Sequence, residues 1–301
     1  MNLNRAVSTV PDHSVSSRKH YNHIMLPPIG LIAGQGRLPI LNAQGIRAAG
    51  RHVACVGLRD QFDGELPAIC DQFSPAGIIQ IGKWIRLLRK WGVKEAVMVG
   101  RVKKARMYQP FRVFRQLPDW RAAMLWYRKL RHDKRNDAIL TAVADELKAS
   151  GITLIDSTQF IPQQMADEGV LTRTKPTSAQ EADIAFALPI AGRMGDLDVG
   201  QSIAVKEREI IAVEAIEGTD AMIRRAGELC RNGKWTLLKV AKPNQDMRFD
   251  VPTIGLLTIE NMKQSGATCL AVEAGKVILL DKPQLLAAAE KAGIAIVGVR
   301  I

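Results

Sequence analysis

The stretch IGLIAGQGRLP, residues 29–39, decides the fold, because a short apolar run gives way there to a glycine turn. A helical pattern follows over residues 40–49, and a second apolar run at 52–58 predicts another strand. A strand, a glycine turn, a helix and a strand in this order form a βαβ unit with two parallel strands. The sequence therefore predicts an α/β fold built on a parallel sheet.

The glycine turn also predicts an anionic ligand. Gly34 and Gly36 let a ligand approach the backbone, the helix behind them favours a phosphate, and Arg37 would add a charge-assisted contact. The turn departs from the dinucleotide fingerprint GxGxxG, because Pro39 replaces the third glycine. The fingerprint also expects an acidic residue after the second strand, which here would have to be Asp60. A nucleotide or its diphosphate is therefore favoured over a nicotinamide cofactor.

The rest of the chain continues the alternation of strands and helices that is typical of α/β proteins. Further strands are predicted at 78–82, 95–100, 152–155, 202–205, 209–214, 235–240, 269–272, 277–280 and 294–299. Helices are predicted at 83–91, 137–150, 179–193, from about 219, 258–265 and 284–292. With 301 residues the chain exceeds what one core usually supports, so we expect two domains. The predicted parts are a disordered leader (1–28), an N-terminal Rossmann-like nucleotide- or phosphate-binding domain (29–160), a linker (161–178) and a C-terminal α/β catalytic domain (179–301).

The composition indicates a cytoplasmic protein. The four cysteines are widely separated and form no CxxC pair, which argues for buried thiols in a reducing compartment. No apolar run approaches the ~20 residues that span a bilayer, and residues 1–28 lack the apolar core of a secretory signal.

A basic stretch between Arg101 and Arg135 carries much of the net charge of +12. This stretch contains 12 lysines and arginines but only two acidic residues, Asp119 and Asp133, and aromatic residues are interleaved with them. These aromatic residues are Tyr108, Phe111, Phe114, Trp120, Trp126 and Tyr127. Such a mixture suits nucleic acid, an anionic membrane surface or a phosphorylated lipid substrate, although a solvated basic helix is the commonest case. Lys103, just after a predicted strand, is well placed for an anionic ligand.

The segment VEAIEGTDAMIRR, residues 213–225, gathers carboxylates, a hydroxyl and arginines where a predicted strand meets a helix. The carboxylates are those of Glu214, Glu217 and Asp220. Such a cluster at the end of a strand can hold a divalent metal or activate a water, and Arg224 can hold a phosphate one turn on. The alternative is an ordinary helix start in which Thr219 or Asp220 caps the first turn.

The loop from Lys239 to Asp250 also follows a predicted strand and carries Lys242 and Arg248. Because the carboxyl ends of parallel strands meet at one edge of a sheet, this loop and residues 213–225 are expected to surround one anionic group. Carboxylates that position water or metal, with cations that take up developing charge, form a phosphoryl-transfer set. A surface loop with self-compensating charges is the alternative.

Several long strings along the chain resemble the motifs of one family. They are GLIAGQGRLP (30–39), VGRVKK (99–104), AVEAIEGTDAMIRRAG (212–227), KVAKPNQDMRFDVPTIG (239–255) and AVEAGKVILLD (271–281). In this order they resemble the UDP-2,3-diacylglucosamine pyrophosphatases of lipid A biosynthesis, the LpxI family, and the resemblance runs from about Ile29 to the C-terminus.

The resemblance implies a hydrolase that splits UDP-2,3-diacylglucosamine into UMP and 2,3-diacylglucosamine 1-phosphate with Mg²⁺ as cofactor. It also implies two domains with the substrate between them, and a catalytic role for Asp220. With such a substrate, the basic stretch is expected to make a peripheral contact with the inner membrane, and no nucleic-acid partner is expected. The sequence leaves a homodimer open. The alternatives from other classes are a basic nucleic-acid-binding protein and a nucleotide-cofactor-dependent oxidoreductase.

The candidate site residues fall into three sets. The catalytic set is Asp220, Glu217, Lys239 and Lys242. The substrate-binding set is Gly34, Gly36, Arg37, Lys103, Thr219, Arg224, Arg248 and Asp250. The metal-binding set is Asp220, Glu214 and Glu273, the last at the end of a further predicted strand.

Overall fold

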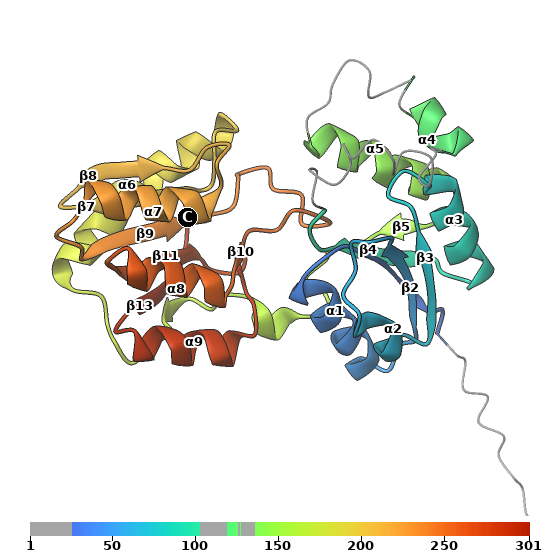
Figure 1. Cartoon of the computed structure of the whole chain (residues 1–301), viewed down its shortest axis with the longest axis horizontal. Helices are drawn as coiled ribbons and strands as arrows, with labels where there is room; N and C mark the ends of the chain where they lie inside the picture. The colour runs from blue at the N-terminus through green and yellow to red at the C-terminus, as the bar shows by residue number, and fades with distance from the viewer. Residues whose placement is uncertain (1–25, 103–118, 126, 128–135) are drawn as a thin grey trace, which may run out of the picture.

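The chain forms two lobes, each built around its own sheet (Figure 1). The computed structural model describes residues 26–102, 119–125, 127 and 136–301. Lys103, Phe111, Phe114 and Trp126, as well as most of the predicted leader, lie outside the described residues.

The N-terminal lobe contains a parallel sheet of five strands in the order β3-β2-β1-β4-β5. The strands are β1 (Ile29–Ala33), β2 (Val53–Leu58), β3 (Gln72–Ala76), β4 (Glu95–Val99) and β5 (Thr153–Leu154). The helices are α1 (Arg37–Ala48), α2 (Leu66–Ile69), α3 (Ile81–Lys90), α4 (Trp120–Leu125) and α5 (Asn136–Ala149). Residues of α1 and α2 share one core cluster with the sheet, and residues of α3, α4 and α5 share the other, so both faces are covered. This arrangement confirms the predicted Rossmann-like fold.

The prediction of a strand at 78–82 was wrong. The third strand is β3, whose sequence QFSPA contains Pro75, and α3 already begins at Ile81. Proline is tolerated in β3 because the strand lies at the edge of the sheet, where a missing N–H donor costs no ladder hydrogen bond. Ile78 and Ile79 belong instead to the turn that leads into α3, where the Gln80 side chain accepts a hydrogen bond of 2.9 Å from the Gly77 N–H.

The C-terminal lobe contains a mixed sheet of six strands in the order β6-β13-β11-β9-β7-β8. The strands are β6 (Gly169–Val170), β7 (Ser202–Lys206), β8 (Glu209–Val213), β9 (Trp235–Lys239), β11 (Ala267–Glu273) and β13 (Ala295–Val299). The helices are α6 (Ser178–Asp196), α7 (Thr219–Leu229), α8 (Leu256–Gln264) and α9 (Lys282–Lys291). The core cluster on one face includes α6, and the cluster on the other includes α7, α8 and α9. The predicted linker, 161–178, includes a 3-10 turn, η4 (Pro162–Gln164), and the edge strand β6.

A loop of the C-terminal lobe, residues 240–252, reaches the N-terminal lobe (Figure 1). Phe249 is 4% exposed and belongs to the same core cluster as Ile32 of β1 and Leu154 of β5. The Ser157 N–H and Oγ each donate a hydrogen bond of 2.9 Å to the carbonyl of Met247. This loop is followed by a small parallel sheet of β10 (Thr253–Ile254) and β12 (Ile278–Leu279). The lobes are therefore joined by packing as well as by the chain.

We expect Phe249→Ala to lower the free energy of unfolding by about 3–5 kcal/mol, because the substitution leaves a cavity in the N-terminal core. Chemical denaturation followed by tryptophan fluorescence measures this change. Asn244→Ala, in an exposed position of the same loop, is the matched control and is expected to stay within about 0.5 kcal/mol of the wild type. Equal stabilities of the two variants would contradict the anchoring role of Phe249.

Candidate active site

Three strands of the C-terminal lobe end at one edge of the sheet, and each is followed there by a polar segment. β9 and β11 are parallel, and β8 runs in the same direction because both β8 and β9 are antiparallel to β7. The Glu214 N–H donates to the Ser202 carbonyl at 2.9 Å, and the Val240 N–H donates to the Gln201 carbonyl at 3.0 Å. The start of β7 thus lies between the two segments, and the prediction that they leave the sheet at the same edge is confirmed.

Lys239 is the centre of the cluster at this edge. The residue is only 6% exposed, and its Nζ donates a hydrogen bond of 2.7 Å to the Thr219 hydroxyl. That hydroxyl donates in turn to Glu214 Oε1 at 2.8 Å. Burial lowers the pKa of Lys239, and the negative charges of Glu214, Asp220 and Asp250 oppose this shift. A buried ammonium group surrounded by carboxylates has its charge compensated and is held in a fixed position.

One carboxylate oxygen of Glu214 accepts no hydrogen bond from the described residues. Its Oε1 accepts from Thr219, but its Oε2 is buried and receives no hydrogen bond from the described residues. A buried acceptor without a donor costs about 1–3 kcal/mol. This oxygen is therefore set up to take a proton, a water or a cation.

Asp220 lies in the first turn of α7 and is held by a neighbouring helix. Its Oδ1 accepts a hydrogen bond of 3.1 Å from the Asn261 amide of α8, and Asn261 is 8% exposed. No sequence signal indicates this partner, because a polar residue within a helical pattern usually faces solvent. Asn261 fixes the orientation of the carboxylate and leaves its second oxygen turned to other partners.

The alternative that Thr219 or Asp220 caps α7 was wrong. The N-cap is Gly218 at φ +80°, and no side chain accepts a hydrogen bond from the first turn. Glycine is needed there because the left-handed region is unfavourable for residues with a Cβ. The Thr219 hydroxyl is used instead between Lys239 and Glu214. The free amide end of the helix adds a positive partial charge beside Asp220.

The glycine turn of the N-terminal lobe lies between the central strands β1 and β4. A Cβ on Gly34 would lie 2.8 Å from the Arg101 carbonyl oxygen, so Gly34 is required for the close approach of the two chains. Gly36, at φ +103°, precedes α1 and has open space around it. Arg37 reaches the other lobe, where its Nε donates to Asp281 Oδ2 at 3.0 Å. Gly36 is therefore the predicted residue of this turn that faces open space.

The comparisons with known proteins cover nearly the whole chain. The family model described as the LpxI N-terminal domain matches residues 28–164, and that of the LpxI C-terminal domain matches residues 167–297. UDP-2,3-diacylglucosamine pyrophosphatase LpxI of Caulobacter vibrioides is 33% identical in an alignment of 288 residues that covers 90% of this chain and 97% of the relative. The chain belongs to the LpxI family.

Four predicted site residues of this LpxI family member are engaged in local pairs. Glu217 accepts from Arg225 at 2.5 Å, and this contact lowers the pKa of Glu217. Lys242 pairs with Asp198, and Arg248 pairs with Asp246 at 2.6 Å and lies 5.3 Å from the Phe249 ring centre. Glu273 is 3% exposed; its Oε2 accepts from the Ala241 N–H at 2.9 Å, and its Oε1 lies 2.7 Å from Lys276 Nζ.

The remaining two predicted residues differ in their settings. Arg224 is exposed on α7. Asp250 is exposed at φ +62° in the loop of residues 240–252, which we call the interlobe loop. The charge of Asp250 acts on Lys239, as noted above. The charge of Asp250 thus connects this part of the loop to the cluster, whereas no contact among the described residues joins the Arg224 side chain to it.

The predicted metal set of the LpxI chain is only partly assembled. Within the residues that the structure describes, no three histidine, cysteine or acidic side chains gather closely enough to hold a metal ion. Glu273 is committed to a backbone amide and Lys276, whereas Glu214 and Asp220 both act on Lys239. Mg²⁺ is usually bound by one or two carboxylates together with waters and substrate phosphates, so Glu214 and Asp220 fit such an ion and Glu273 does not.

Proposed function

We propose that this chain hydrolyses the diphosphate bond of UDP-2,3-diacylglucosamine and releases UMP and 2,3-diacylglucosamine 1-phosphate. The observation that carries the proposal is the hydrogen-bonded series Lys239–Thr219–Glu214, with Asp220 at the same edge of the sheet. The relative that covers this chain almost end to end is named a UDP-2,3-diacylglucosamine pyrophosphatase. An anhydride between two phosphates needs this combination of a fixed cation and carboxylates.

Each side chain of the cluster has a distinct part in the proposed reaction. The Lys239 ammonium takes up the charge that develops on the phosphoryl oxygens, and Glu214 holds its position through Thr219. Asp220 orients the attacking water and accepts its proton, while Asn261 keeps the carboxylate in place. The water oxygen bonds to phosphorus, and the bridging oxygen leaves with the other phosphate.

The N-terminal lobe supplies the other wall of the proposed site. The amide end of α1 at Gly36 is suited to the diphosphate or to the nucleotide phosphate. The Arg37–Asp281 pair and the Phe249 anchor support a substrate held between the lobes, since both already connect them. We assign the diphosphate to the space between α1 and the Lys239 cluster.

Magnesium is the proposed cofactor, with Glu214 and Asp220 as its protein ligands. The unpaired Oε2 of Glu214 supports this choice, because it offers a buried anionic oxygen. When bound, the ion would neutralise phosphoryl charge and lower the pKa of a water.

The function is tested by incubating the protein with UDP-2,3-diacylglucosamine and separating the products by chromatography. We expect UMP and the sugar 1-phosphate in equal amounts. UDP together with the free diacylated sugar would place the cleavage at the wrong bond and overturn the proposal. RNA binding without hydrolysis would favour the alternative of a nucleic-acid-binding protein.

Chelation should remove the activity. With EDTA we expect the rate of UMP release to fall at least about a hundredfold, since a catalytic metal contributes several kcal/mol, and added Mg²⁺ should restore it. Glu214→Gln should need more Mg²⁺ for half-maximal rate, and direct Mg²⁺ binding by calorimetry should weaken in parallel. Full activity in EDTA would show that Lys239 suffices without a metal.

We also propose a cytoplasmic location with a peripheral contact on the inner membrane. No helix within the described ranges is both long and apolar enough to cross a bilayer. A diacylated substrate has to be collected from a membrane, and the basic aromatic stretch 101–135 supports that task. The homodimer stays a prediction.

A further inference from the structure

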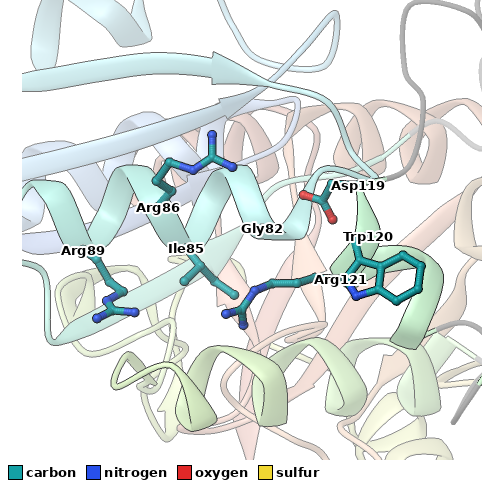
Figure 2. Close-up of a pocket in the computed structure, with 7 residues that line it drawn as sticks. All are labelled: Gly82, Ile85, Arg86, Arg89, Asp119, Trp120 and Arg121. Carbon is teal, nitrogen blue, oxygen red and sulfur yellow. The ribbon is translucent and has the colours of Figure 1, made fainter.

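A cavity of about 450 Å³ lies in the N-terminal lobe, between α3 and α4 (Figure 2). Gly82, Ile85, Arg86 and Arg89 line it from α3, and their spacing of three and four residues places them on one face of that helix. The residues that line it from the other side begin at Asp119 and include Trp120 and Arg121 of α4. The cavity includes none of the residues assigned to the proposed hydrolysis, which in this lobe are those of the turn before α1.

The walls of this cavity carry uncompensated positive charge. Arg86 and Arg89 are exposed and, within the described part of the chain, neither side chain takes part in a hydrogen bond or an ion pair. Arg121 extends beneath α3 on the same side as Arg89 (Figure 2) and pairs with Glu146 of α5 at 2.6 Å.

The acidic residue of the wall does not neutralise the two free arginines. Asp119 Oδ2 accepts from the Lys83 N–H at 3.1 Å, and its Oδ1 accepts from the Ala122 N–H at 3.0 Å. These bonds tie α4 to the start of α3, and no described acidic residue pairs with Arg86 or Arg89. Figure 2 shows the Arg86 and Arg89 side chains extending to opposite sides of α3, and such exposed guanidinium groups favour an anion that offers several oxygens.

An apolar side chain lies beside these charges. Trp120 is 76% exposed, which is unusual for so large a ring, and Ile85 is buried in the wall of the cavity. Trp84 and Leu88, also buried, fix α3 against the core, so the arginines project from a rigid element. An exposed tryptophan next to cations is typical of the headgroup level of a membrane.

We propose that this cavity binds the phosphate of an anionic phospholipid headgroup and seats the N-terminal lobe on the bilayer. Arg86 and Arg89 contact the phosphate, and Trp120 inserts among the headgroups. The proposal rests on the proposed function, in which the substrate is presented by a membrane. A lipid fits better than nucleic acid, because single strands are held on a groove that offers several stacking rings, and among the described residues that line this cavity Trp120 is the one aromatic side chain.

The test compares two double variants that lose the same charge. Arg86→Gln/Arg89→Gln alters the cavity, and Arg193→Gln/Arg231→Gln alters two exposed arginines of the other lobe that also have no described partner. Flotation measures binding to vesicles of phosphatidylglycerol and phosphatidylethanolamine, with phosphatidylcholine vesicles as the neutral reference. We expect the cavity variant to bind the anionic vesicles about thirty-fold more weakly, from ~1 kcal/mol per arginine, and the control variant within about threefold of wild type. Trp120→Ala should also weaken binding, although it keeps every charge.

A second measurement separates this proposal from the proposed function. Release of UMP is followed from substrate embedded in anionic vesicles and from a short-chain, water-soluble analogue. The cavity variant should lose rate with the embedded substrate and keep the wild-type rate with the analogue. If wild type hydrolyses neither substrate, the proposed function fails, and the flotation result alone decides the cavity.

Three results would overturn the lipid site. One is equal loss of vesicle binding in both double variants, which would indicate a diffuse charge effect. Another is unchanged vesicle binding in the cavity variant. The third is tight binding of a single-stranded RNA oligomer that the cavity variant loses while its vesicle binding is retained.

Discussion

Asp220→Ala is expected to lower the rate of UMP release by about a thousandfold, within the range that a general base or metal ligand contributes. The carboxylate is the proposed base for the attacking water, and Asn261 holds it by one hydrogen bond of 3.1 Å. Loss of that bond exposes no large cavity, so the melting temperature should change little. A coupled assay for UMP and circular dichroism during heating measure the two quantities.

The controls for Asp220 separate charge from shape. Asp220→Asn keeps an oxygen that can accept from Asn261 but removes the negative charge, and it should be as inactive as the alanine variant. Glu228→Ala removes an exposed carboxylate from the same helix and should keep wild-type activity. An active Asp220→Asn would reduce the role of Asp220 to positioning.

Lys239→Met is expected to reduce kcat by at least about a hundredfold, since it removes the buried cation that stabilises charge in the transition state. Methionine fills a similar volume, so the core around β9 should stay packed. Lys239→Arg should not rescue the rate, because the guanidinium is too wide for the hydrogen bond of 2.7 Å to Thr219. A Lys239→Met enzyme with normal kcat and raised KM would assign the lysine to ground-state binding alone.

The pH dependence of Lys239 follows from its lowered pKa. Burial moves this pKa below the ordinary value of 10.5, so the cation is lost on raising the pH before an exposed lysine would titrate. Activity should therefore fall on the alkaline side, and this limb should be absent from the residual activity of Lys239→Met. Between the lowered pKa and 10.5 the unfolded chain binds the extra proton, so the stability of wild type relative to Lys239→Met should rise with pH there.

The architecture could be predicted from the sequence because the spacing of apolar residues and the alternation of strands with helices are visible in short stretches of the chain. The apolar runs at β1, β2 and β9 are buried along their whole length, and their order with the helices specifies a doubly covered sheet. The same reasoning placed residues 214–220 and the Lys239 loop at one edge. The strand β3 was not predicted, because an edge strand needs few apolar residues.

The side-chain partners of the site could not be predicted in this way. Asn261 meets Asp220 across 41 positions of the chain, and Thr219 reaches Lys239 across 20. Such contacts depend on how helices rotate when they pack, and no spacing rule encodes that. The paired states of Glu217, Lys242 and Glu273 were missed for the same reason, since local charge density does not reveal which ions neutralise one another.

The interlobe loop has a mechanical consequence. It leaves β9 directly after Lys239. Near its other end it carries Phe249, which is fixed in the opposite lobe. Because the loop is attached to β9 and Phe249 is fixed in the opposite lobe, we expect a change in the spacing of the lobes to act on the strand end that carries the ammonium. Binding free energy gained by drawing the lobes together is coupled, with equal magnitude in both directions, to the alignment of the cation with its carboxylates. Through the interlobe loop, the spacing of the lobes and the alignment of Lys239 depend on each other.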